Sequence, residues 1–281
     1  MDIATRFLAT AFAAVTMLGA WPAGISSARA ADYEREDRWA AEVVPSIVVG
    51  DAVWLATPSK AKVLAILTLP PSPKVAAGGV IVVHGLGVHP DWELIGGLRT
   101  GLADAGYVTL AVQMPVLAAS ASREDYSATM LEAAERIAAA VDYLRTKSIA
   151  KVAIVSHSMG ASMANAFLAR NAIDAWAPIG MFGPFAAPPR EPVLDIVAET
   201  EIAPVRETAP ARAVTLPKDA CSRQLTIAGA DHYFERRQKE LVATIAAFLE
   251  RAFAGRCATG GRRTARWRRR GPPNRPWRPR T

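Results

Sequence analysis

The stretch VAIVSHSMGASMANAFLA, residues 152–169, decides the fold. Its first residues, Val152 to Val155, form a continuous apolar run, as in a strand buried on both faces of a parallel sheet. Its last nine, Ala161 to Ala169, are mostly small and apolar and favour a helix. Between them Ser156-His157-Ser158-Met159-Gly160 places a serine at the turn from strand to helix. A G-x-S-x-G nucleophile requires this context, so Ser158 is the candidate nucleophile.

One position departs from that pattern, because Ser156 stands where the first glycine is expected. Serine is small, but it tolerates unusual backbone dihedrals and close approach less well than glycine. The alternative interpretation is an ordinary turn between a strand and a helix, in which the serine only caps the helix.

Strands and helices alternate on both sides of this stretch. The pattern predicts an α/β fold, with a mostly parallel, doubly wound sheet flanked by helices and ligands bound beyond the carboxyl ends of the strands. Three antiparallel edge strands are expected at Val43–Val49, Val53–Ala56 and Lys62–Leu69. Further strands are expected at Gly79–Val83, Tyr107–Val112, Lys151–Ser156, Ala175–Met181, Pro192–Ala198 and Leu225–Ala228, and helices at about 128–145, 159–169 and 235–253.

The loop His84-Gly85-Leu86-Gly87 follows one of the buried strands. A glycine-flanked loop at this point can aim a backbone N–H group into the cleft. We expect the N–H of Leu86 and that of Met159 to form an oxyanion hole, preset for the charge of a tetrahedral intermediate. A tight turn without a catalytic role is the alternative.

His232 lies between the last predicted strand and the last predicted helix. A general base arrives there in the chain order serine, acid, histidine, so His232 is the candidate base. A surface histidine that caps the helix is the alternative. Of the others, His84 is expected to make a structural hydrogen bond, His157 to point away from the nucleophile, and His89 to lie in a loop.

Two carboxylates compete for the role of the acid. Glu201 lies three residues beyond Ala198, where a strand-end loop can reach the histidine, and we favour it. Asp195 is the alternative acid, but it lies within the predicted strand, where its charge would have to be buried and paired.

Four motifs carry a resemblance over about Gly79 to Leu249. The chain resembles members of the α/β-hydrolase superfamily, and in particular an uncharacterised bacterial α/β-hydrolase-like family. The motifs are HGLGVHPDW (84–92), QMPV (113–116), SHSMG (156–160) and ADHYF (230–234). The resemblance implies the α/β-hydrolase fold and makes Ser156 an expected residue, but it names no substrate.

Only about ten residues, 182–191, separate two of the predicted strands, so no large cap domain is expected there. An open cleft bordered by apolar side chains would suit the acyl part of an ester. The candidate pocket residues are Leu86, Met159, His84, Met114, Phe182 and Phe185, although the apolar ones could equally belong to the core. We expect a serine hydrolase that cleaves a small carboxylic ester through an acyl-enzyme, without a cofactor or metal. The alternative is a non-catalytic envelope binding or maintenance protein on the same fold.

Both ends of the chain differ in character from residues 31–258, which we take as one domain. Residues 1–30 combine an apolar run with Ala28-Arg29-Ala30, which predicts a cleaved signal peptide and a periplasmic or secreted protein; an uncleaved anchor is the alternative. Residues 259–281 are rich in arginine and proline and predict a disordered tail. This tail contains nine arginines and no acid, and the whole chain has a net charge of +7. The rest of the chain therefore has a net charge of about −2, and we expect no basic nucleic-acid-binding face on the domain.

The two cysteines, Cys221 and Cys257, could form a disulfide in an exported protein. Neither has the spacing of a metal site, and the four histidines form no recognisable ligand cluster.

Overall fold

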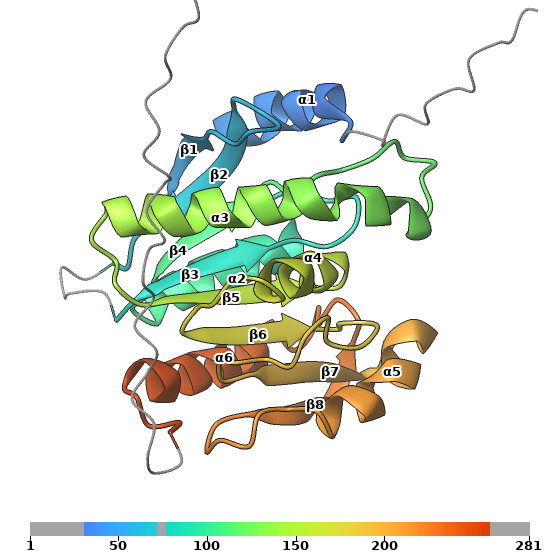
Figure 1. The fold of residues 1–281 in the computed structure, drawn as a ribbon. Coiled ribbons are helices and arrows are strands. Elements are labelled where there is room, and N and C mark those ends of the chain that lie inside the picture. Colours follow the sequence, from blue (N-terminus) through green and yellow to red (C-terminus); the bar gives the residue numbers. More distant parts are fainter. Residues whose placement is uncertain (1–30, 72–76, 259–281) are drawn as a thin grey trace, which may run out of the picture.

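The computed structural model describes residues 31–71 and 77–258. The predicted signal peptide and the predicted tail lie outside the described residues. Eight strands form one sheet in the order β1-β2-β4-β3-β5-β6-β7-β8, with helices on both faces (Figure 1). The strands are β1 Asp51–Leu55, β2 Val63–Thr68, β3 Gly79–Val83, β4 Val108–Val112, β5 Val152–His157, β6 Ala175–Ile179, β7 Leu194–Thr200 and β8 Arg223–Asp231.

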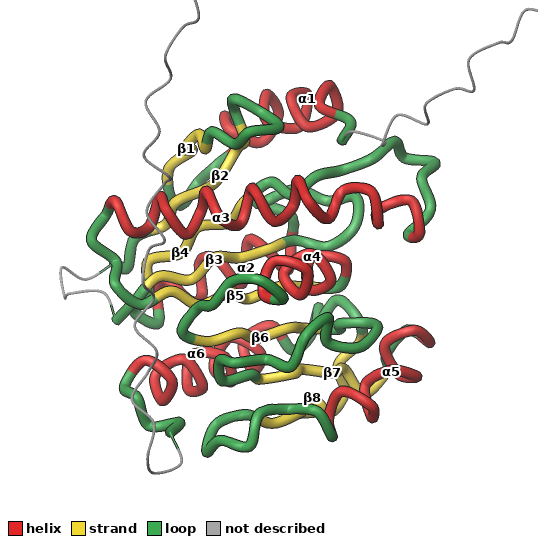
Figure 2. The backbone as a smooth tube through the Cα atoms, viewed as in Figure 1, coloured by secondary structure: helices red, strands yellow, loops and turns green. Residues whose placement is uncertain are grey.

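Helices alternate with strands from β3 to β6 and again from β7 to α6, while α1 precedes the first strand; Figure 2 shows helices and strands in different colours. The α-helices are α1 Tyr33–Val43, α2 Glu93–Asp104, α3 Met130–Thr146, α4 Met159–Leu168, α5 Ala203–Ala213 and α6 Gln238–Phe253. Short 3-10 helices cover Val44–Ser46 and Glu124–Thr129. Among the described residues, no helix is long and apolar enough to cross a bilayer.

The sheet is mostly parallel. The pairs from β4 through β3, β5, β6 and β7 to β8 are parallel, whereas β1 pairs with β2 and β2 with β4 in antiparallel register. This confirms the predicted α/β architecture with an antiparallel edge. Because parallel strands end on the same side, the loops after β3, β5, β7 and β8 meet at one edge.

Two apolar layers cover the sheet, and β3 shows how its residues divide between them. Ile81 and Val83 pack with α3 and α4 on one face, and Val80 and Val82 pack with α2 and α6 on the other. All five residues of β3 and all six of β5 are buried, which explains their continuous apolar sequence. The loops that follow β3 and β5 therefore start from the buried centre of the sheet.

The N-terminal prediction was wrong, because residues 43–49 do not form a strand. The polar stretch before them forms α1, whose first turn is capped by the Asp32 side chain accepting from the Arg35 N–H at 2.9 Å. Two further helices, α2 and α5, were not predicted from the sequence. Their three glycines and two prolines lower intrinsic helix propensity, and packing against the sheet overrides it in α2.

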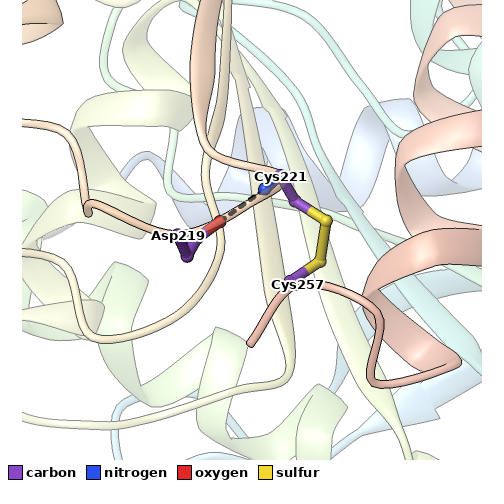
Figure 3. A group of neighbouring side chains, drawn as sticks. All are labelled: Asp219, Cys221 and Cys257. Carbon is purple, nitrogen blue, oxygen red and sulfur yellow. Dashed lines mark hydrogen bonds between the residues drawn. A yellow bond between two sulfur atoms is a disulfide. The ribbon is translucent and has the colours of Figure 1, made fainter. Parts of the chain in front are cut away.

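A disulfide joins Cys221, just before β8, to Cys257, just after α6 (Figure 3). The aspartate Asp219 accepts a hydrogen bond from the Cys221 N–H at 2.7 Å. Closing a loop of this length stabilises a fold by about 3–4 kcal/mol in the chain-entropy account. Because both sulfurs are used in the bond, they offer no thiolate to a metal ion here.

Candidate active site

The turn that carries Ser158 is strained. Strand β5 ends at His157, α4 begins at Met159, and Ser158 between them has φ 54° and ψ −120°. A non-glycine residue at positive φ persists only where its surroundings fix it. Here the Ser158 N–H donates to the carbonyl of Ile179 at the end of β6, at 2.9 Å. The strand-turn-helix prediction around the serine is therefore observed.

The structure explains why small residues, Ser156 and Gly160, stand two positions before and two positions after the serine. A Cβ atom on Gly160 would lie 2.3 Å from the carbonyl oxygen of His84, so only glycine lets α4 approach the end of β3. Ser156, which replaces the usual glycine, is fully buried, and its Oγ accepts from Trp176 Nε1 at 2.9 Å. A hydroxyl at that position satisfies an indole donor that would otherwise be buried without a partner.

Ser158, His232 and Glu201 lie in a line of hydrogen bonds. The Nε2 atom of His232 is 3.0 Å from Ser158 Oγ, and its Nδ1 atom is 2.7 Å from Glu201 Oε2. Both His232 and Glu201 are buried, and Ser158 is partly exposed. The carboxylate also accepts from the N–H groups of Ala198 and Ile202, which fixes its orientation. Three elements distant in sequence thus bring together a nucleophile, a base and an acid in triad geometry.

Asp195, the alternative acid, is occupied elsewhere. Its carboxylate accepts from Arg212 Nε at 3.0 Å and Nη2 at 3.2 Å, and from Gln224 Nε2 at 2.7 Å. Both side chains of the ion pair are fully buried. The structure therefore brings Glu201, and not Asp195, to the imidazole of His232.

Residues 80–280 match the sequence profile of the Alpha/beta hydrolase family. This chain belongs to that family. No curated protein matches the sequence of this hydrolase significantly. Similar solved structures include Est1E from Butyrivibrio proteoclasticus (TM-score 0.58, 18% identity, 73% of this chain and 99% of that one) and a serine hydrolase without a lid from Xanthomonas campestris (TM-score 0.58, 16% identity, 76% and 98%). An esterase domain from Rhodothermus marinus is also similar (TM-score 0.54, 14% identity, 72% and 98%). At these identities the likeness shows the fold.

Among the residues that the structure describes, this hydrolase has no large cap over its serine. Residues 180–193, which connect β6 to β7, contain no helix. The loop is held instead by polar contacts from α4 and α5. Asn165 donates to the carbonyl of Pro184 and accepts from the Ala186 N–H, while the Gly183 N–H donates to Thr208 Oγ1.

Two of the predicted pocket residues belong to the interior of the hydrolase. His84 and Met114 have almost no exposed surface, so neither borders an open cleft. His84 Nε2 accepts from the Met114 N–H at 2.8 Å, and its Nδ1 lies 2.8 Å from the carbonyl of Gly85. Burial lowers the pKa of His84 to about 3, so the ring is neutral and structural. The structural role expected for His84 fits these contacts, whereas the pocket role does not.

Two further predicted pocket residues, Phe182 and Phe185, are partly buried. The Phe182 ring centroid lies 5.1 Å below the guanidinium carbon of Arg123, and Phe185 packs edge-on against Trp176 at 5.6 Å. Neither contact places these rings against Ser158.

His157 was predicted to point away from the nucleophile, and the structure shows in addition that its ring packs against the base. Its Nε2 atom lies 2.9 Å from the carbonyl oxygen of His232, and the two ring centroids are 4.8 Å apart. Burial, with a smaller contribution from His232, lowers the pKa of His157 to about 3, so its Nε2–H can donate while the ring stays neutral. No signal in the sequence reveals this contact, because it depends on where the loop after β8 arrives.

The two predicted oxyanion donors occupy suitable elements. Met159 is the first residue of α4, where a backbone N–H has no partner within the helix. Leu86 lies in the loop after β3, and its side chain is exposed. Its neighbour Gly85 is close to the nucleophile, because a Cβ on Gly85 would lie 3.3 Å from Ser158 Cβ. Their assignment as oxyanion donors stays a prediction.

Proposed function

We propose that this hydrolase cleaves carboxylic esters through an acyl-enzyme on Ser158. The observation that carries the proposal is the continuous line from Ser158 Oγ through the His232 imidazole to the Glu201 carboxylate. A serine hydroxyl is a weak nucleophile unless an adjacent base takes its proton, and the base works best when a third group orients it.

In the first half of the proposed reaction, His232 Nε2 takes the proton of Ser158 as Oγ bonds to the ester carbonyl carbon. The negative oxygen of the tetrahedral intermediate accepts from the N–H groups of Leu86 and Met159. The carbon–alkoxy bond then breaks, the alkoxy oxygen takes the proton from His232, and the alcohol leaves an acyl-enzyme.

In the second half, His232 takes a proton from water, and the resulting hydroxide attacks the acyl carbon. The Ser158 ester bond breaks, Oγ regains the proton, and the carboxylic acid is released. Glu201 keeps the Nδ1 proton in place and stabilises the imidazolium in both halves. The balanced reaction consumes one ester and one water, and no step here draws on a cofactor.

Several features support an ester substrate. The loop between β6 and β7 forms no cap, which leaves room for a small-molecule ester, and two structurally similar proteins are described as an esterase domain and as Est1E bound to ferulic acid. We further propose that the protein is exported, because residues 1–30 have a signal-peptide pattern and a disulfide is typical of oxidising compartments. The complete line of hydrogen bonds does not favour a non-catalytic binding protein.

Hydrolysis of p-nitrophenyl butyrate tests this proposal. We expect turnover by the wild type, and we expect Ser158→Ala to lower kcat by about 10³-fold or more. The control is Ser46→Ala, an exposed serine in the 3-10 helix after α1, which should leave turnover unchanged. A folded wild type without turnover, or a fully active Ser158→Ala variant, would overturn the proposal.

A further inference from the structure

One aromatic side chain, Tyr233, lies beside the base, and a second, Trp92, packs against it. The Tyr233 ring centroid is 5.2 Å from that of His232, and Trp92 packs edge-on against Tyr233 at 5.7 Å. Trp92 directly precedes α2, and Tyr233 belongs to the loop between β8 and α6. The pair therefore joins the loop before α2 to the loop after β8, which carries the base.

Tyr233 differs in burial from the residue that follows it in the loop. Its side chain is 48% exposed, whereas the next residue, Phe234, is fully buried and anchors the loop in the apolar layer under α6. Leu86, in the loop that approaches Ser158, also leaves 41% of its surface exposed. An exposed apolar surface next to a reactive group is a usual sign of a ligand contact.

The chemistry of the site says which part of an ester would meet this surface. The carbonyl oxygen of the substrate must face the oxyanion donors at Leu86 and Met159. The leaving oxygen must come within hydrogen-bond reach of His232 Nε2, since this atom returns the proton. The group attached to the leaving oxygen therefore extends along the side of His232, where Tyr233 lies.

On the side of Met114 and Phe182, the site has less free apolar surface for a ligand. Met114 is fully buried, and Phe182 is already in contact with the Arg123 guanidinium. Two aromatic rings contact His232 in the part of the chain that the structure describes: the His157 ring at 4.8 Å is buried, whereas the Tyr233 ring at 5.2 Å is half exposed and open to a ligand.

We propose that Tyr233 and Trp92 form a subsite for an aromatic group on the alcohol part of the ester. The substrate class is then an ester of an aromatic alcohol, which stacks or packs edge-on against Tyr233. This inference rests on the proposed ester hydrolysis and adds the recognition of the leaving group.

A pair of acetate esters tests the subsite. Benzyl acetate and ethyl acetate share an acyl group and release alkoxides of similar basicity, so their difference reports mainly the aromatic ring. We expect a higher kcat/KM for benzyl acetate in the wild type. Tyr233→Ala and Trp92→Ala should lower this kcat/KM by about 3- to 10-fold, as for loss of an aromatic contact, and change that for ethyl acetate by less than about 2-fold. Tyr233→Phe keeps the ring and should keep the preference.

Tyr143→Ala is the matched control, since Tyr143 lies on α3 in the layer on the other face of the sheet and should affect neither ester. Equal losses for both esters in Tyr233→Ala would mean a structural role and would overturn the subsite. Turnover of both esters by the wild type without a preference for the benzyl ester would also overturn it, while leaving ester hydrolysis intact.

A binding measurement separates the two proposals. In the Ser158→Ala background, saturation-transfer NMR should detect benzyl acetate on the protein, and adding Tyr233→Ala should weaken the signal. A signal that persists at full strength in the double variant contradicts the subsite whether or not the enzyme turns over esters.

Discussion

Strand β7 and the loop that follows it hold two buried carboxylates with different partners. Asp195, near the start of the strand, contacts the guanidinium of Arg212, and Glu201, just beyond its end, contacts the imidazole of His232. Both carboxylate side chains are almost inaccessible to water. Arginine keeps its proton at every pH a protein meets, whereas histidine can gain and lose one. The partner therefore makes Asp195 structural and leaves Glu201 available to support proton transfer.

Replacing each acid by its amide tests this contrast, and the larger effect is expected at the strand end. Glu201→Gln should lower kcat by about 10³- to 10⁴-fold, because the amide cannot stabilise the imidazolium and can favour the wrong tautomer. The free energy of unfolding should change by less than about 1.5 kcal/mol, since the replacement removes a buried charge without changing the packing volume. Esterase assays and urea denaturation measure both quantities. Full activity in this variant would contradict the assignment of the acid.

Asp195→Asn should give the opposite result. The free energy of unfolding should fall by about 3–5 kcal/mol, because Arg212 is left buried without its counter-charge. The kcat of the folded molecules should stay within about threefold. Replacing both partners by apolar residues, as in Asp195→Leu with Arg212→Met, should recover part of the lost stability. A variant that loses turnover but keeps its stability would reverse the roles given to the two acids.

A third kind of polar group is the buried, neutral histidine, represented by His84 and His157. The pKa of each is about 3 in the folded protein because of burial, against 6.5 for the free side chain, so the unfolded chain binds more protons between these values. Stability contributed by each ring is therefore complete above about pH 6.5 and is lost as the pH falls toward 3, by about 1.4 kcal/mol per pH unit. Burial raises the pKa of Glu191, so this group has the opposite effect: as the pH rises above the ordinary pKa of a glutamate, it lowers the stability of the folded protein.

The variant His157→Gln isolates one of these rings, because glutamine can still donate to the carbonyl of His232 but does not titrate. Urea denaturation at several pH values between 4 and 6 gives the free energy of unfolding as a function of pH. In the variant this free energy should fall less steeply as the pH decreases than in the wild type, by about 1.4 kcal/mol per pH unit, because one proton fewer is taken up on unfolding. Identical slopes in the two proteins would mean that His157 is protonated in the native state.

Much of the fold was predictable because β3 and β5 are continuous apolar runs and the serine turn has a local signature. The order serine, acid, histidine follows from the same topology, so it placed Ser158, Glu201 and His232 at strand ends. Local sequence patterns did not predict the elements whose secondary structure depends on packing against the rest of the fold. The segment before β1 is stabilised as a helix by the Asp32 cap and by burial, and α2 forms despite its glycines.

The site was predictable only in part, for a related reason. The choice between Asp195 and Glu201 depends on Arg212 of α5, which pairs with Asp195. No local sequence pattern predicts this contact. His84 and Met114 carry pocket-like chemistry in the sequence but are covered by the fold. Tyr233 stood within a recognised motif, yet its exposure and its distance from His232 are properties of the folded loop.

Fluorophosphonate labelling followed by peptide mapping tests the central claim most directly, because the probe reacts with serine oxygens that a base activates. The account predicts one adduct on Ser158 in the folded wild type, much slower labelling in Glu201→Gln and none in Ser158→Ala. A folded protein that takes up no probe, or that carries the adduct on another residue while Ser158→Ala remains labelled, would contradict it.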